Sequence, residues 1–138
     1  MRQALSEAQA AAERGEVPVG AVVVYGDRIV ARGHNLTEAL SDATAHAEMQ
    51  AITAAAGRIG GKYLRECRLY VTVEPCPMCA GACYWSQIGQ VIYGAADPKR
   101  GASRVSPSLY HPKTVVRGGV LERECGELMD RFFRTLRE

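Results

Sequence analysis

The sequence has no long apolar run and little excess of either charge. No uninterrupted apolar segment approaches the ~18 residues of a membrane-spanning helix. The amphipathic start of the chain, residues 1–12, lacks the apolar core of a secretion signal. We therefore expect no membrane association and a cytoplasmic location. The net charge of +2 excludes neither a small-molecule substrate nor a nucleic acid.

The cysteine content argues against a disulfide-stabilised scaffold. The count is odd, and two of the five form a C-x-x-C: Cys67, Cys76, Cys79, Cys83 and Cys125. Such a pattern favours metal binding in a reducing compartment. The 138 residues contain no internal repeat and no linker, so we expect a single domain over 1–138.

Apolar spacing and turn residues predict alternating helices and strands. Helices are expected at 2–14, 45–57, 75–88 and 121–136, and strands at 19–25, 28–32, 67–73, 91–94 and 114–116. Gly26-Asp27 indicates a hairpin between the first two strands, and Thr44 is expected to cap the second helix. A long loop with some helix is expected at 95–113. The later strand–helix alternation implies crossovers, which predicts a three-layer α/β/α fold with a mixed sheet.

One histidine and two cysteines have the spacing of zinc ligands. His46 lies at the start of one predicted helix, and Cys76 and Cys79 lie at the start of another. Residues three apart share a helical face, and a helix N-terminus favours the thiolates that bind metal. Both helix starts are expected beyond the carboxyl ends of strands. Three protein ligands leave a position for water, as in catalytic zinc sites.

Glu48 is a candidate proton carrier beside this site. In an ideal helix it would point about 160° away from His46, so the pairing needs an irregular first turn or a long reach. Its carboxylate could then take a proton from a zinc-activated water, whose pKa falls toward ~7. The alternative is a closed site with Cys83 or Cys67 as fourth ligand, although Cys67 is more typical of a small core residue.

The H-x-E and later P-C-x-x-C motifs together match the zinc deaminase signature. Further motifs extend the likeness: Val17-Pro18-Val19-Gly20-Ala21-Val22, Thr44-Ala45-His46-Ala47-Glu48, Val73-Glu74-Pro75-Cys76-Pro77-Met78-Cys79-Ala80-Gly81-Ala82, Gly94-Ala95-Ala96-Asp97-Pro98-Lys99 and Arg131-Phe132-Phe133. With these motifs the chain resembles the cytidine/deoxycytidylate deaminase superfamily and, within it, the bacterial tRNA adenosine deaminases. The likeness runs from Glu16 almost to the C-terminus and implies a cytidine-deaminase-like fold.

The resemblance implies hydrolysis of adenosine to inosine at the wobble position of a tRNA anticodon, expected to be that of an arginine tRNA. His46, Cys76 and Cys79 would hold one zinc ion per subunit. Glu48 would move protons from the attacking water to the ring nitrogen and the departing amine. General acid–base catalysis of this kind is worth about 10²- to 10⁴-fold. The family likeness also implies a homodimer whose subunits together complete the RNA surface.

The resemblance assigns the substrate contacts as well. Asn35 would hydrogen-bond the flipped nucleoside; by itself it is equally typical of a turn. The backbone around Ala47 would line the pocket, together with the turn at 17–19. Asp97 would lie close to the substrate strand.

Other residues leave a second substrate open. The pair Tyr84-Trp85 after the cysteine motif resembles bacterial guanine deaminases of the same superfamily. Ala96 stands where an arginine is common in the family. A free purine base deaminase, with guanine as substrate, is therefore the alternative. A non-catalytic zinc-binding RNA module is a third reading, against which the intact Glu48 argues.

A basic stretch favours the RNA substrate. No acidic residue lies between Asp97 and Glu122, and Tyr110 and His111 are interleaved with five cations, Lys99, Arg100, Arg104, Lys113 and Arg117. Such a mixture suits the phosphates and unstacked bases of an RNA loop. We expect Lys99, Arg100 and Arg104 to contact the tRNA anticodon loop; the alternative is a solvated surface loop.

Overall fold

A single mixed sheet organises the chain in the computed structural model, which describes residues 1–137. Its strands are β1 (Gly20–Tyr25), β2 (Arg28–His34), β3 (Cys67–Val73), β4 (Gln90–Ala95) and β5 (Val115–Arg117). The order is β2-β1-β3-β4-β5, with β1 antiparallel to both neighbours and β3, β4 and β5 parallel. The predicted hairpin, parallel part and edge strand are all confirmed.

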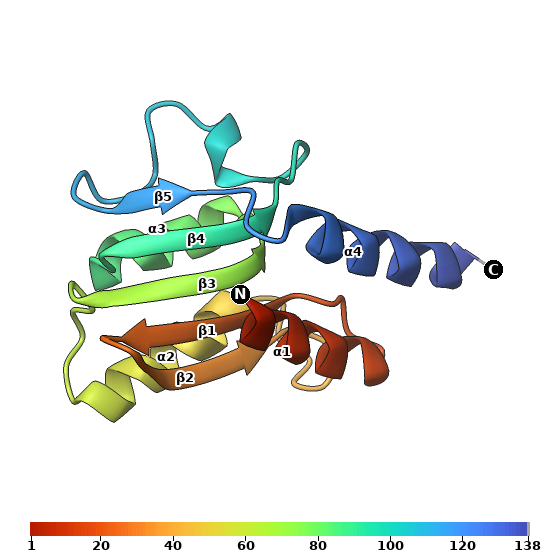
Figure 1. The fold of residues 1–138 in the computed structure, drawn as a ribbon, viewed down its shortest axis with the longest axis horizontal. Helices are drawn as coiled ribbons and strands as arrows, with labels where there is room; N and C mark the ends of the chain where they lie inside the picture. The colour runs from red at the N-terminus through yellow and green to blue at the C-terminus, as the bar shows by residue number, and fades with distance from the viewer. Residues whose placement is uncertain (138) are drawn as a thin grey trace.

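Helices cover both faces of this sheet (Figure 1). Helices α1 (Arg2–Glu13) and α4 (Glu122–Arg137) lie on one face, and α2 (Ala47–Ile59) and α3 (Pro77–Ser86) lie on the other. The predicted three-layer α/β/α arrangement is therefore confirmed. Within residues 1–137, no helix combines the length and the apolar character needed to cross a membrane.

The main core lies between the sheet and the α2–α3 layer. Leu69, Val71 and Val91 of the central strands are fully buried there, as are Leu64 and Ile88 from the connecting segments. Full burial of such a side chain stabilises a fold by about 1.5–3 kcal/mol. The alternating apolar residues predicted for β3 therefore lie in this core.

Gly33 allows α2 to approach the sheet very closely. A Cβ atom at this position would lie 2.8 Å from the carbonyl oxygen of Ala47 and 2.9 Å from the backbone nitrogen of Ala51. Contacts this short are not tolerated between real side chains and backbone, so only glycine permits the observed packing. The first turn of α2 is therefore held directly against β2.

The two connections between the parallel strands, from β3 to β4 and from β4 to β5, are built differently. Helix α3 starts just beyond the C-terminal end of β3 and returns antiparallel to it, ending before β4 begins (Figure 1). The segment 96–114 then leads from the C-terminal end of β4 back to the start of β5, arching outside β5 in Figure 1, and includes the short 3-10 helix η1 (Ala102–Arg104). This matches the predicted long loop with some helix.

Candidate active site

The three predicted metal ligands converge beyond the C-terminal end of β3. His46 Nδ1 lies 3.6 Å from Cys76 Sγ and 3.5 Å from Cys79 Sγ. All three ligand atoms lie within 4.8 Å of one another. A tetrahedral zinc ion with Zn–S of about 2.3 Å and Zn–N of about 2.0 Å separates nitrogen and sulfur by about 3.5 Å. The spacing and the donor chemistry both fit zinc.

Two of these ligands come from helix N-cap positions. His46 is the N-cap of α2, with extended backbone angles (φ −71°, ψ 156°), and Cys76 is the N-cap of α3 (φ −73°, ψ 171°). The prediction that α2 includes residues 45 and 46 and is capped by Thr44 is wrong. The Thr44 hydroxyl instead donates to Asp42 Oδ1 at 2.7 Å. Because His46 is not helical, the expected divergence from Glu48 does not arise.

Cys76 and Cys79 hold a proton that a bound metal ion would displace. The hydrogen bond from Cys79 lowers the pKa of Cys76 to about 5, and the same contact raises the pKa of Cys79 far above its ordinary range. Without a metal the pair therefore keeps one proton at neutral pH. Thiolates are the form that binds metal, so metal binding releases that proton.

No fourth protein ligand joins the cluster within residues 1–137. Cys83, one turn after Cys79 on α3, is fully buried, and burial raises the pKa of its thiol. Cys67 and Cys125 are also buried away from the three ligands. A zinc ion held by these three residues would keep one coordination position for water, which is typical of catalytic zinc.

Glu48 lies buried beside the ligand set. Only 4% of its surface is exposed, and burial raises its pKa to about 7. Its carboxyl also interacts with the thiol of Cys79 and with the charges of Cys76 and His46. The charge of a bound divalent cation would favour the carboxylate and lower this pKa. The structure thus brings Glu48 to the site without making it a ligand.

Asn35 is buried at the end of β2, in the loop that leads to α2. Its backbone N–H donates to Val19 O at 3.1 Å, and its Oδ1 accepts from the backbone N–H of Thr37 at 3.4 Å. The residue therefore does stabilise a turn. It is also tied to the 17–19 turn that was expected to line the pocket. Its contact with substrate stays a prediction, as does that of the backbone at Ala47.

Two buried carboxylates, which the sequence did not single out, hold the loops around the site. Glu16 is 1% exposed and accepts backbone N–H bonds from Glu38 at 3.1 Å and Ala39 at 2.8 Å. Glu74 is 6% exposed and accepts from the backbone N–H groups of Asp97 at 3.0 Å and Ser103 at 2.9 Å. The sequence carries a signal for only one of these two carboxylates: Glu74 is a charged residue directly between a buried strand and Pro75.

The predicted RNA contacts lie on the loop that Glu74 holds. The carboxylate of Asp97 accepts from the backbone N–H groups of Lys99 at 3.1 Å and Arg100 at 3.0 Å. The Arg104 guanidinium donates to Lys99 O at 2.6 Å. All three cationic side chains are exposed. The structure thus groups Lys99, Arg100 and Arg104, while Lys113 lies at the opposite end of α3.

Comparison with known proteins assigns the chain to a family. Residues 1–95 match the family model described as the cytidine and deoxycytidylate deaminase zinc-binding region. The chain belongs to this deaminase family. It is 46% identical over 143 residues to the tRNA-specific adenosine deaminase of Bacillus subtilis, covering 100% of this chain and 89% of that protein.

Solved structures of this family share the fold. One, from studies of A-to-I editing by tRNA:A34 deaminases at the wobble position of transfer RNA, is 43% identical with a TM-score of 0.87, covering 93% of this chain and 96% of that one. The guanine deaminase of Bacillus subtilis is 40% identical with a TM-score of 0.66, covering 69% and 61%. The cytidine-deaminase-like fold is therefore confirmed, together with the zinc-binding deaminase domain.

Proposed function

We propose that this deaminase converts adenosine to inosine at the wobble position of a tRNA anticodon, with an arginine tRNA as its substrate. The observation that carries the proposal is the convergence of His46, Cys76 and Cys79 with Glu48 buried beside them. Full-length similarity to a tRNA-specific adenosine deaminase supports RNA as the substrate class. In this proposal residues 1–138 act as one catalytic unit.

His46, Cys76 and Cys79 would hold one zinc ion. When bound, zinc supplies a water molecule acidified to a pKa of about 7, and so a nucleophile at neutral pH. The Glu48 carboxylate would carry one proton of the attacking water to the ring nitrogen of the adenine. It would then carry the second proton to the departing amine, which leaves as ammonia while the oxygen stays on the ring carbon. Its burial keeps competing bulk water away from this transfer.

Three further residues would position the substrate. The Asn35 side chain would hydrogen-bond the flipped nucleoside, and the backbone at Ala47 would line the base pocket. Asp97 would lie beside the RNA strand while its carboxylate shapes the loop that presents Lys99, Arg100 and Arg104. These three exposed cations would contact phosphates of the anticodon loop, where base flipping disrupts little stacking.

The decisive test compares two substrates with the zinc-loaded protein. We expect an arginine tRNA anticodon stem-loop to yield inosine and ammonia, and free guanine to yield no ammonia. The Glu48→Gln variant is the matched control: it should keep its zinc and lose about 10²- to 10⁴-fold in turnover. Turnover of guanine alone would overturn the proposal, and full activity of Glu48→Gln would overturn the assigned proton carrier.

Guanine deamination is the second candidate function because two observations favour it. The chain shares 40% identity with a guanine deaminase over 69% of its length. The Tyr84-Trp85 pair adds the resemblance to guanine deaminases that the sequence suggested. The triple variant Lys99→Gln, Arg100→Gln and Arg104→Gln separates the two candidates, since a free-base deaminase has no use for these cations. Its activity should fall on the stem-loop and show a weaker dependence on salt.

We also infer that the protein is a homodimer working in the cytoplasm. Trp85 is 77% exposed and packs edge-on against Tyr84, with ring centroids 5.4 Å apart. Exposed aromatic pairs are enriched at protein interfaces. The free thiols of all five cysteines suit a reducing compartment. Light scattering during gel filtration tests the dimer: wild type should elute at twice the chain mass, and Trp85→Ala should shift toward the monomer.

A further inference from the structure

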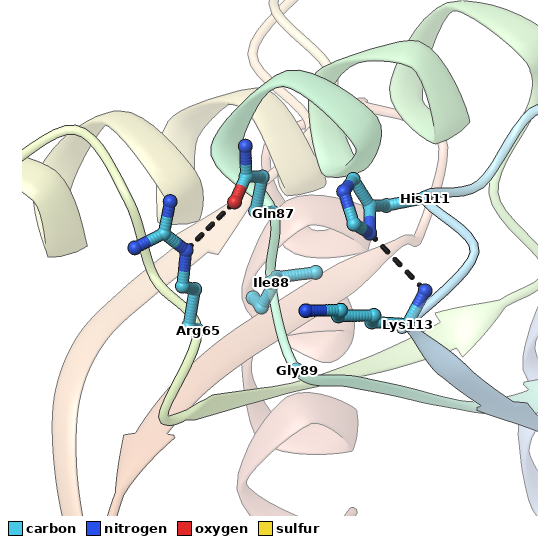
Figure 2. Close-up of a pocket in the computed structure, with 6 residues that line it drawn as sticks. All are labelled: Arg65, Gln87, Ile88, Gly89, His111 and Lys113. Atoms are coloured by element: carbon cyan, nitrogen blue, oxygen red, sulfur yellow. Dashed lines mark hydrogen bonds between the residues drawn. The ribbon is translucent and has the colours of Figure 1, made fainter.

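A second basic site lies at the end of α3 that is remote from the metal ligands. It is a pocket of about 450 Å³ lined by Arg65, Gln87, Ile88, Gly89, His111 and Lys113 (Figure 2). Helix α3 has ten residues and is about 15 Å long, so the pocket and the Cys76 end are well separated (Figure 1). Two members of the basic stretch in the sequence, His111 and Lys113, therefore belong to this place and not to the loop at 97–104.

Three side chains with hydrogen-bond donors, Arg65, His111 and Lys113, line this pocket. Figure 2 shows Arg65 on one side of Ile88 and His111 and Lys113 on the other. The Arg65 Nε donates to Gln87 Oε1 at 2.7 Å, and its guanidinium lies 4.5 Å from the centroid of the Tyr63 ring. These two contacts engage Nε and the face of the guanidinium. The terminal nitrogens point away from His111 and Lys113 in Figure 2, so the exposed Arg65 side chain must turn to contact a ligand together with them.

The imidazole of His111 is also oriented as a donor. Its Nδ1 accepts from the backbone N–H of Lys113 at 3.1 Å. In the neutral ring the proton must then sit on Nε2. The ring packs against Tyr84, with centroids 5.6 Å apart, which fixes its plane. In Figure 2 the ring nitrogen without a dashed line faces the pocket.

The charge of the pocket is not neutralised by the protein. Within residues 1–137 no carboxylate lies within ion-pairing distance of Arg65 or Lys113. The nearest acid in sequence, Glu66, accepts instead from the Tyr25 hydroxyl at 3.0 Å. The C-terminal end of α3 contributes roughly half a negative charge. Two full cations outweigh it, so the pocket favours an anion.

We propose that this pocket binds a phosphate group, namely a backbone phosphate of the RNA substrate away from the anticodon. Forked guanidinium donors and a lysine are the usual partners of phosphate oxygens. Contacts to phosphate fix the register of a nucleic acid without reading its bases. The RNA as phosphate source rests on the proposed function; free phosphate or a mononucleotide offers the same chemistry and is independent of it.

The first experiment tests the pocket without RNA. Sodium phosphate is titrated into the zinc-loaded protein at constant ionic strength, and the backbone amide resonances of Gly89 and Lys113 are followed by NMR. We expect saturable shifts in wild type and in the control Arg28→Gln/Arg123→Gln, which removes the same charge from exposed sites. The double variant Arg65→Gln/Lys113→Gln should lose them. No saturable shift in wild type would overturn the proposal. An unchanged phosphate response in the double variant would also overturn the proposal. A lowered unfolding midpoint in that variant would then show that Arg65 and Lys113 only balance the partial negative charge at the C-terminal end of α3.

The second experiment identifies the source of the phosphate. The double variant should raise KM for the anticodon stem-loop several-fold and reduce the slope of log KM against log salt by about 0.7–0.9 for each phosphate that it no longer binds. The control variant should match wild type. If the double variant loses the phosphate response but keeps the wild-type KM for the stem-loop, the pocket binds free phosphate or a mononucleotide. That result would overturn the RNA contact. If wild type fails to deaminate the stem-loop, the proposed function fails, and the phosphate titration still decides the pocket.

Discussion

The carboxylate of Glu74 accepts a 3.0 Å hydrogen bond from the backbone N–H of Asp97, which lies 23 residues further along the chain. Glu74 stands two residues before the metal-ligand candidate Cys76. The same carboxylate accepts from Ser103 N–H, and a side chain at Gly101 would collide with it. The loop with the predicted RNA contacts is thus fastened to the segment that carries the candidate metal ligands Cys76 and Cys79.

Glu74→Gln should therefore loosen this loop. The amide keeps one acceptor oxygen but turns an NH₂ group toward a backbone N–H, which leaves that part-buried donor unpaired. We expect a loss of about 1–3 kcal/mol in the free energy of unfolding, measured with urea, and a higher KM for the stem-loop. Glu66→Gln removes an exposed carboxylate as a control and should stay within about 0.5 kcal/mol of wild type. Equal stability of both variants would show that the loop does not depend on Glu74.

Periodicity and short motifs in the sequence were sufficient to predict the sheet, its helices and the three residues that cluster as candidate metal ligands. Alternation of apolar residues in 67–73 and the position of Pro77 depend on local chemistry, so they are visible in one segment. The N-cap position of His46 was not predicted, because Thr44 has the side chain of a typical cap but donates to Asp42 instead. Glu16 and Glu74 were missed because their partners are backbone N–H groups of distant loops. These are tertiary relationships, which no local pattern encodes.

The pH dependence of stability should reveal the burial of Glu48. With the metal removed, burial raises its pKa from 4.5 to about 7. Between these values the folded protein keeps a proton that the unfolded chain releases, so the free energy of unfolding falls as pH rises. The loss is on the order of 1.4 kcal/mol for each unit of pKa difference.

The Glu48→Gln variant isolates the contribution of Glu48. The lowered pKa of Cys76 makes the free energy of unfolding rise with pH, but it does so in both proteins. In metal-free samples unfolded with urea, wild type should lose stability relative to the variant between pH 4.5 and 7, and the difference should be constant above that range. Parallel curves for the two proteins would show that the carboxyl is already ionised at the lower end of this range despite its burial.

Metal content should distinguish an open site from a closed one. Cys79→Ser removes a ligand and should abolish stoichiometric zinc after dialysis. Cys83→Ala should retain one zinc per chain, because the Cys83 thiol is buried outside the ligand cluster and burial disfavours its thiolate. Elemental analysis of both variants decides the matter. Loss of zinc from Cys83→Ala would establish a fourth protein ligand and remove the position that the reaction needs for water.

Two glycine-to-alanine changes should have opposite effects on α2. In Gly33→Ala the new Cβ would meet the backbone of α2 at Ala47 and Ala51, so the helix must move away from β2. His46 caps this helix and Glu48 lies in its first turn, so zinc affinity and turnover should fall together with stability. In Gly57→Ala the new Cβ meets no atom within 4 Å, and reduced freedom of the unfolded chain should stabilise the fold by about 0.4–1 kcal/mol. Thermal unfolding and a zinc competition assay check both changes. Unchanged zinc affinity in Gly33→Ala would mean that the site tolerates displacement of α2, and that the geometry of its ligands is set by α3 alone.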